Sequence, residues 1–180
     1  NDKQRKAMLE AAAISGIHVL RIMNEYTATA LAYGIYRSND FHESEPTVVA
    51  FCSVGHSHFS CSVVKFIRGQ LQVLSEVSDR TVGGRDMDKL IMEHFAAEFQ
   101  KEHGVDPLEA PKARYRREEA VGKVKKTLSA NREAPVSVEC LVDDFDLHGM
   151  MERDLFEKLC APMIPKLQAC MAQAVAQAGL

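Results

Sequence analysis

The sequence predicts a mixed α/β fold in which helices alternate with two groups of antiparallel strands. Runs in which Val and other apolar residues recur lie between residues 47 and 77 and between 135 and 150. Apolar residues recur at helical spacing before, between and after these runs. The chain has 180 residues, of which 46% are hydrophobic, so it can bury a core in one domain or in two small lobes.

The region before residue 47 is expected to hold two helices and one short strand. Ala, Met, Leu and Ile fall at helical spacing between Asp2 and Ser15, and Gly16 is typical of a residue that ends a helix. The next elements are expected to be a strand (HVLRIM, 18–23), a helix of small residues (TATALAYGIY, 27–36) and a polar loop (38–46).

Three strands in succession then predict an antiparallel meander. They are expected at 47–54, 58–67 and 71–77. Arg68, Gly69 and Gln70 form the second turn, because a glycine between two β-branched runs is a turn signal.

The pattern changes to helix after Gly83 and Gly84. An apolar stripe that includes Phe95 and Phe99 predicts a helix that Gly104 ends, with Asp86 near the positive end of the helix dipole. The remaining elements are expected to be a helix (about 111–129), two strands (135–142 and 145–150) joined at Asp143–Asp144, and a last helical region (153–178) that Pro162 and Pro165 divide or kink.

Composition excludes several classes of protein. With 22 basic and 25 acidic residues the net charge is −3, so no global field attracts nucleic acid or anionic lipid. The five cysteines are odd in number and contain no C-x-x-C pair, which disfavours a disulfide framework or a zinc site and favours a reducing compartment. No apolar run is long enough to span a bilayer, and no signal peptide is recognisable. The chain begins and ends within helical sequence, so we expect it to be a piece of a longer protein.

The turn between the first two strands of the meander is the first candidate site. Gly55 lets the backbone turn so that amide groups converge on a phosphate, and Ser57 and the flanking His56 and His58 add donors. Spacing alone favours an ordinary hairpin with polar turn residues. No carboxylate lies between residues 47 and 66, and two histidines without a third ligand do not make a metal site, so no metal ligands are assigned.

The helix segment GKVKKTLS is the second candidate site. Four of its residues are spaced so that they share one helix face, which can hold a sugar and base: Gly122, Lys125, Lys126 and Ser129. The simpler alternative is a solvated basic face. Without aromatic stacking partners nearby, that alternative is favoured over a nucleic-acid surface.

Four segments, in unbroken order, resemble the heat-shock-70 chaperone superfamily. They are NEYTATALAYGIY (24–36), VGHSHFSCSVVKFIRGQLQVL (54–74), TVGGRDMDKLIMEHF (81–95) and KVKKTLSANREAPVSVE (123–139). The chain is most similar to the heat-shock-110 branch, whose second phosphate loop also reads Gly-His-Ser where the ordinary chaperones have a glycine triplet.

The resemblance implies an actin-like, ribonuclease-H-like ATPase fold of which this chain supplies mainly lobe II, with an α+β sub-lobe. The implied division is the end of lobe I with the crossover helix (1–36), the lobe II meander with the phosphate loop (37–84), the smaller α+β sub-lobe (85–150) and the C-terminal helices of lobe II (151–180).

The resemblance also implies roles for individual residues. Glu25 matches a catalytic acid near the metal and the attacking water, although Tyr26 replaces the proline that usually follows. The implied phosphate contacts are Gly55, His56, Ser57 and His58, and the implied adenosine contacts are Gly122, Lys125, Lys126 and Ser129.

Two residues depart from the family pattern. Ser53 stands where the phosphate loop opens with an aspartate that holds hydrated Mg²⁺, and a hydroxyl does not supply that charge. Gly122 replaces a glutamate that hydrogen-bonds the ribose in the family. Without that charged hydrogen bond, the free energy of nucleotide binding is expected to be weaker by roughly 1.5–3 kcal/mol unless neighbouring residues compensate.

These features favour a fragment of a cytoplasmic stress-response chaperone that acts as a co-chaperone or nucleotide exchange factor with weak or absent hydrolysis. The expected partners of the full-length protein are a heat-shock-70 chaperone and unfolded clients, with no nucleic acid and no membrane. The intact domain is expected to bind ATP or ADP with Mg²⁺, while the fragment alone is expected to hold no nucleotide and to hydrolyse none. An active ATPase or phosphotransferase of the same fold, and an interaction surface that binds no nucleotide, remain alternatives.

Overall fold

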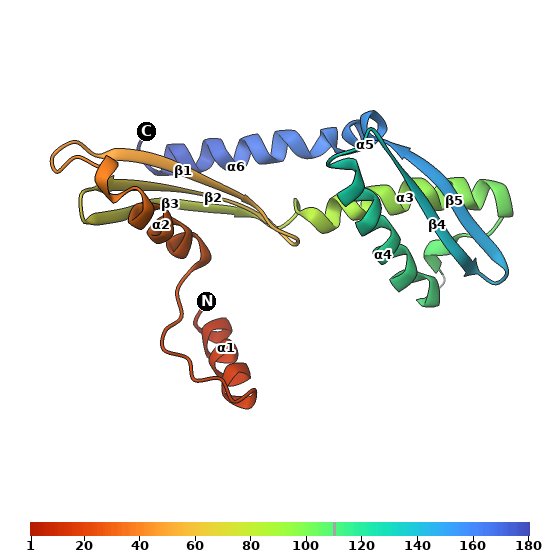
Figure 1. Cartoon of the computed structure of the whole chain (residues 1–180), viewed down its shortest axis with the longest axis horizontal. Coiled ribbons are helices and arrows are strands. Elements are labelled where there is room, and N and C mark those ends of the chain that lie inside the picture. The colour runs from red at the N-terminus through yellow and green to blue at the C-terminus, as the bar shows by residue number, and fades with distance from the viewer. Residues whose placement is uncertain (110) are drawn as a thin grey trace. The chain divides into compact units, whose positions relative to one another are not determined.

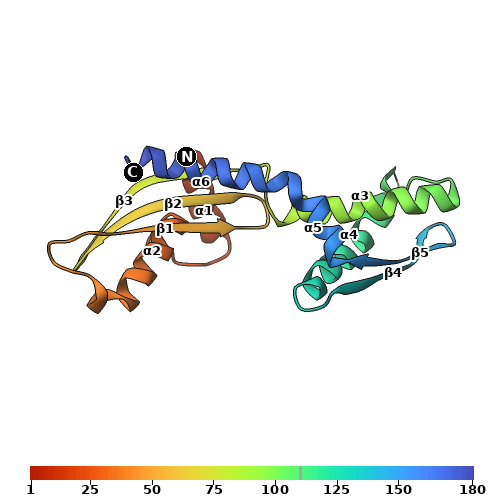
Figure 2. The same ribbon diagram turned by 90° about the horizontal axis from the view of Figure 1, so that it is seen from above.

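The computed structural model describes residues 1–109 and 111–180, with side chains described outside 109–114. The chain divides into two compact units. Unit 1 comprises residues 1–51 and 62–75, and unit 2 comprises residues 52–61 and 76–180, so the boundaries fall within three long strands. Figures 1 and 2 show the elements of each unit. The fourfold division that the resemblance implies stays a prediction.

Unit 1 begins with two helices, α1 (Asp2–Ile14) and α2 (Glu25–Tyr36), followed by a short 3-10 turn at Ser38–Asp40. Asn1 caps α1 through a capping box with Gln4, and Gly16, with a φ of 72°, follows its end in the left-handed conformation. The predicted strand at 18–23 is wrong, because this segment has no regular structure. Leu20 is 91% exposed, and the segment pairs with none of the described strands, so its apolar pattern does not form a sheet.

The predicted meander is confirmed as a sheet with strand order β1-β2-β3. Its strands are β1 (Thr47–Val54), β2 (Phe59–Ile67) and β3 (Gln70–Asp79). Connections this short join strands that run in opposite directions. The central strand β2 is buried along most of its length, which explains why most of its residues are apolar.

Aromatic rings form the core of unit 1 between α2 and the sheet. Phe41 stacks on Phe66 with ring centroids 4.9 Å apart, and the edge of Tyr33 packs against Phe51 at 5.4 Å. A Cβ on Gly34 would lie 3.1 Å from the Phe66 ring, so a glycine at this position of α2 lets the helix approach the core closely.

Unit 2 contains the remaining helices and a separate β-hairpin. In chain order they are α3 (Gly84–His103), a 3-10 turn at Pro107–Glu109, α4 (Pro111–Leu128), β4 (Glu133–Val142), β5 (Phe145–Glu152), α5 (Arg153–Cys160), a 3-10 turn at Ala161–Met163 and α6 (Ile164–Gln177). The predicted break near the two prolines is confirmed, since the 3-10 turn separates α5 from α6.

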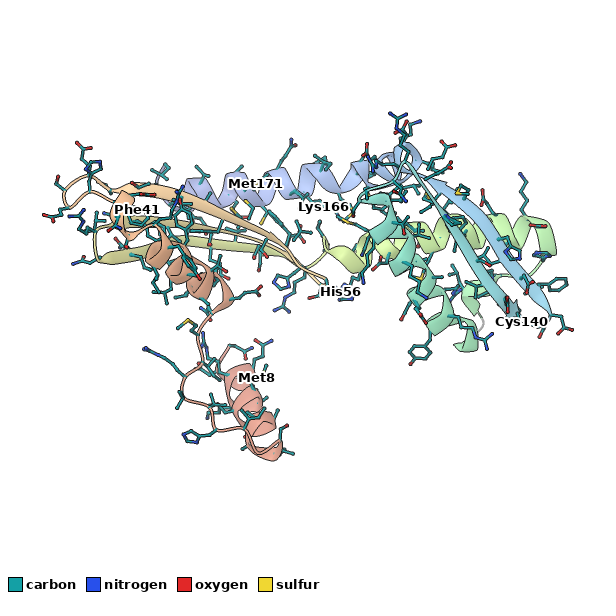
Figure 3. All side chains as sticks on the ribbon, viewed as in Figure 1. Met8, Phe41, His56, Cys140, Lys166 and Met171 are labelled. Atoms are coloured by element: carbon teal, nitrogen blue, oxygen red, sulfur yellow. The ribbon has the colours of Figure 1, made fainter. Side chains whose placement is uncertain are left out.

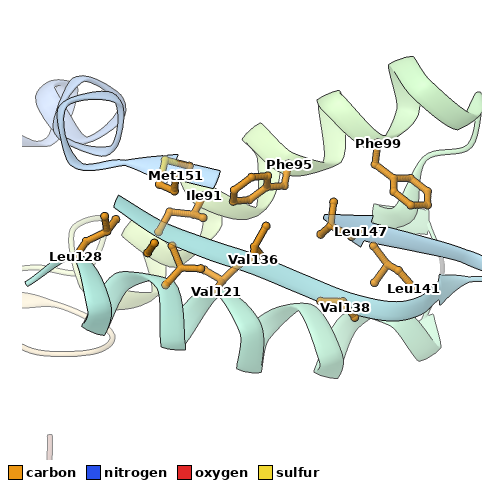
Figure 4. Packing of buried hydrophobic residues seen from close by; sticks show 12 residues of the cluster. Ile91, Phe95, Phe99, Val121, Leu128, Val136, Val138, Leu141, Leu147 and Met151 are labelled. Atoms are coloured by element: carbon orange, nitrogen blue, oxygen red, sulfur yellow. The ribbon is translucent and has the colours of Figure 1, made fainter. Parts of the chain in front are cut away.

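The core of unit 2 lies where α3 and α4 pack on the β4–β5 hairpin (Figure 4). Alternate residues of β4 are buried, and their cross-strand partners in β5 include Gly149 opposite Val136. A Cβ on Gly149 would lie 2.6 Å from the ring of Phe95, so this glycine makes room for a phenylalanine that α3 buries. None of the described helices is long and apolar enough to cross a membrane.

Candidate functional site

The turn of residues 55–58 closes the hairpin between β1 and β2, with His56 at its tip (Figure 3). The amide of Gly55 donates to the carbonyl of His58 at 2.9 Å. The side chains of His56 and Ser57 are exposed, and Ser57 Oγ lies 3.2 Å from His58 Nδ1. Within the described residues, no carbonyl accepts a hydrogen bond from the amides of His56 or Ser57. The turn therefore presents free donors of the kind that a phosphate needs.

The other side of the turn is seated on the beginning of α3. The amide of Gly84 donates to the carbonyl of Gly55 at 2.9 Å, and the amide of Arg85 donates to the carbonyl of His56 at 2.8 Å. The next two amides of α3, those of Asp86 and Met87, both reach the carbonyl of Gly83. All four N-terminal amides of α3 are thus satisfied, so an anion at this site depends on the turn and not on the helix end.

Gly83 makes this contact possible. A Cβ at this position would lie 2.6 Å from the carbonyl oxygen of His56 and 2.8 Å from the amide nitrogen of His58. These are backbone atoms of the turn, so they cannot swing aside as a side chain would. Sequence reasoning treated Gly83 and Gly84 only as the start of a helix and missed their role. The signal that was present is a pair of consecutive glycines, since residues without a Cβ allow another backbone to approach closely.

Lys125 joins α4 to the beginning of α3. Its Nζ lies 2.7 Å from Asp88 Oδ1 and donates to the carbonyl of Gly84 at 3.0 Å. The two side chains are only 26% and 17% exposed, so the ion pair is largely shielded from water. Burial raises the pKa of the nearby Cys160 thiol, and the charge of Lys125 opposes that rise.

Gly84 is the point at which the two candidate segments meet. A Cβ there would lie 3.4 Å from Lys125 Nζ, 3.6 Å from the Cα of His56 and 3.7 Å from the carbonyl oxygen of Gly55. The turn of residues 55–58 and the helix segment of residues 122–129 are therefore neighbours within unit 2.

The other predicted adenosine contacts lie on the open side of α4. Lys126 and Ser129 are exposed, and Ser129 Oγ donates back to the carbonyl of Lys125 at 3.5 Å. A Cβ on Gly122 would meet no atom within 4 Å. Space for a ligand thus exists beside Gly122. The expected helix face is divided, because Lys125 is held by Asp88 and Gly84 whereas Lys126 and Ser129 are exposed.

Because Gly122 is helical and faces open space, Gly122→Ala is expected to stabilise the chain. The expected gain is about 0.5–1 kcal/mol in the free energy of unfolding, since alanine restricts the unfolded chain and favours helix. Urea denaturation measures it. A decrease in stability would show that the space beside Gly122 is filled by a neighbour.

The acidic residues do not assemble into a metal centre in the described part of the chain. No group of three or more His, Cys, Asp or Glu side chains is placed to hold an ion there. Asp86 Oδ2 is buried without a hydrogen-bond partner and lies 4.0 Å from Arg85 Nε. Glu25, the predicted catalytic acid, is exposed in the first turn of α2 and belongs to unit 1. Its role stays a prediction.

Comparison with known proteins identifies a family. The family model described as "Hsp70 protein" matches residues 1–180. The chain is 43% identical to Heat shock 70 kDa protein 14 of Arabidopsis thaliana over 99% of its own length and 21% of that protein. It is 46% identical to Heat shock protein 88 of Dictyostelium discoideum over 88% of its length and 20% of that protein. It is 41% identical to Heat shock protein hsp88 of Neurospora crassa over 99% of its length. The chain spans about a fifth to a quarter of these relatives.

Proposed function

Because the chain belongs to the heat-shock-70 family, we propose that it forms one wall of the nucleotide cleft in a longer chaperone of the heat-shock-110 type. The proposed activity of the whole protein is that of a co-chaperone or nucleotide exchange factor that holds nucleotide with weak or absent hydrolysis. The expected partners are a heat-shock-70 chaperone and unfolded client proteins, and the proposed location is the cytoplasm.

The observation that carries this proposal is the meeting of the two candidate segments at Gly84. The turn of residues 55–58 offers free amides, and the segment of residues 122–129 offers an open helix face beside it. A phosphate and an adenosine in one ligand require such a pair of neighbouring surfaces. The contact at Gly84 places these two surfaces next to each other.

The residues divide the work of binding between them. The amides of His56 and Ser57, with the Ser57 hydroxyl, would hold phosphate oxygens as neutral donors. Lys126 and Ser129 would contact the sugar or base from the open side of α4. Lys125 would position α4 and would not bind the ligand itself, because Asp88 and the carbonyl of Gly84 hold its ammonium group.

The residues at the turn do not fit a bound Mg²⁺ by themselves. Ser53, which stands where the family has its metal-holding aspartate, is exposed and carries no charge. Mg²⁺ bound with a nucleotide would neutralise charge on the phosphates, and without a carboxylate at the turn this chain gives such an ion no fixed position. Slow hydrolysis follows, since positioning and electrostatic stabilisation supply most of the rate in phosphoryl transfer. An active phosphotransferase is not favoured for the same reason.

The test is ATP turnover by the full-length protein and by its Ser53→Asp variant. We expect the wild type to turn over ATP slowly and the variant to be about tenfold faster or more, because the new carboxylate gives the metal an anchor. Ser78→Asp, at an exposed position of β3, is the matched control and should leave turnover unchanged.

Brisk turnover by the wild type would contradict the proposal that hydrolysis is weak or absent. A calorimetric titration with ADP measures separately whether the full-length protein binds nucleotide at all. Absence of binding heat would mean that the chain serves as an interaction surface instead.

A further inference from the structure

Three cysteines gather in unit 2 beside the hairpin that carries the turn. Cys52 lies on β1 and is exposed, while Cys61 on β2 and Cys170 on α6 are 1% and 4% exposed. The Sγ atoms of Cys52 and Cys61 are 3.6 Å apart. Cys170 Sγ instead donates to the carbonyl of Val77, also at 3.6 Å. One accessible thiol thus touches one buried thiol on the neighbouring strand.

Regular antiparallel pairing from the turn would place Cys52 directly opposite Cys61, in agreement with the contact between their sulfur atoms. Gly55 and His58 pair across the turn through the hydrogen bond from Gly55 to His58. Counting three residues from this pair along each strand reaches Cys52 and Cys61. Because pairs alternate along antiparallel strands, theirs is a non-hydrogen-bonded pair, in which the Cα atoms are only about 4.5 Å apart. That separation is within the range that a disulfide bridges without backbone movement.

The surroundings give the two thiols different reactivities. Burial, together with the neighbouring Cys52, raises the pKa of the Cys61 thiol to about 12, so Cys61 is a poor nucleophile toward a solvent oxidant. Cys52 lies on the edge strand and is open to solvent. Oxidation should therefore begin at Cys52. Cys61 is close enough to attack the oxidised sulfur of Cys52 and form a disulfide.

We propose that Cys52 and Cys61 form a reversible oxidation site that closes into a disulfide under hydrogen peroxide. Peroxide oxidises Cys52 to a sulfenic acid and leaves as one water. The sulfur of Cys61 then attacks the sulfur of Cys52, the S–O bond breaks, and the Cys61 proton leaves with the hydroxyl as a second water. Two thiols are thereby oxidised by two electrons in total, and one peroxide is reduced. A dithiol reductant reduces the disulfide to the two thiols by exchange and is itself oxidised to a disulfide.

The bond would enclose residues 53–60 and hence the whole turn of residues 55–58. It would tie β1 to β2 only three residues from Gly55 and His58, so the register of the hairpin is locked next to the candidate phosphate site. This site depends only on the two strands and does not require that the turn binds nucleotide.

Peptide mapping tests the proposal on the purified chain. Trypsin cleaves after Arg37 and after Lys65, so Cys52 and Cys61 share one peptide, while Cys140, Cys160 and Cys170 each lie on a different one. After treatment with peroxide and alkylation without reductant, peptide 38–65 is expected to lose two hydrogens in mass and to take up no alkylating reagent. Dithiothreitol should restore both alkylation sites.

Variants distinguish a disulfide between Cys52 and Cys61 from a disulfide that involves Cys170 and from oxidation of Cys52 alone. Cys170→Ser should leave the mass change intact, and Cys52→Ser should leave Cys61 reduced and open to alkylation after denaturation. Three results would overturn the proposal. They are a peptide that joins Cys61 to Cys170, sulfinic acid at Cys52 with Cys61 still reduced, and unmodified thiols at both positions.

Discussion

Gly83→Ala is expected to destabilise the chain by about 1–3 kcal/mol and to weaken ADP binding by the full-length protein about tenfold. The added methyl would lie 2.6 Å from the carbonyl oxygen of His56 and 2.9 Å from the carbonyl carbon of Ser57. The turn must then move away from α3, which breaks the hydrogen bonds that Gly84 and Arg85 donate to it. Urea denaturation measures the first effect, and calorimetric titration with ADP measures the second.

Gly84→Ala is the matched control, because its added methyl would meet its nearest neighbour, Lys125 Nζ, at 3.4 Å. That separation is an ordinary contact, and alanine is favourable at the start of a helix. The control should leave stability within about 0.5 kcal/mol of the wild type. Equal effects of the two substitutions would show that the close approach at Gly83 does not hold the turn.

Lys125→Met is expected to destabilise the chain by about 2 kcal/mol, because it leaves the Asp88 carboxylate in a largely shielded position without its cation. The estimate is lower than the roughly 3–5 kcal/mol typical of a fully buried pair, since water still reaches part of both side chains. Asp88→Asn should produce a similar loss. The double variant should be more stable than the sum of the two losses predicts, with a coupling of about 1 kcal/mol or more in urea denaturation.

Lys126→Met is the control for this cycle, since Lys126 is adjacent on α4 and exposed. Its effect should stay within about 0.5 kcal/mol. Strictly additive losses for Lys125→Met and Asp88→Asn would mean that the 2.7 Å pair contributes nothing to the link between α3 and α4.

Local patterns predicted most of the elements. The apolar stripe through Phe95 and Phe99 marked α3, and the left-handed Gly104 ends it as expected. The strands of both sheets were identified within about two residues, because alternation and turn residues such as Gly69 and Asp143 are local signals. The segment at 18–23 was mistaken for a strand because its apolar residues fit one, yet it pairs with no strand among the residues that the structure describes.

The candidate site itself was only partly predictable. Sequence reasoning selected the turn and the α4 segment separately, and the family resemblance assigned them to one ligand. Their meeting at Gly84, and the pairing of Lys125 with Asp88, depend on the way the helices pack in three dimensions. No local periodicity encodes contacts between residues so far apart in the chain. The helix-face argument did not foresee that Lys125 is held by α3 while Lys126 is exposed.

Hydrogen–deuterium exchange of the full-length protein, with and without ADP, tests most directly whether the turn and the α4 segment form one nucleotide site. The amides of His56 and Ser57 have no carbonyl acceptor in the described part of the chain, so they should exchange quickly without ligand. With ADP, exchange should slow at these two amides and, at the same ADP concentration, in the segment of residues 122–129. Slower exchange in only one of the two segments, or in neither, would contradict the account.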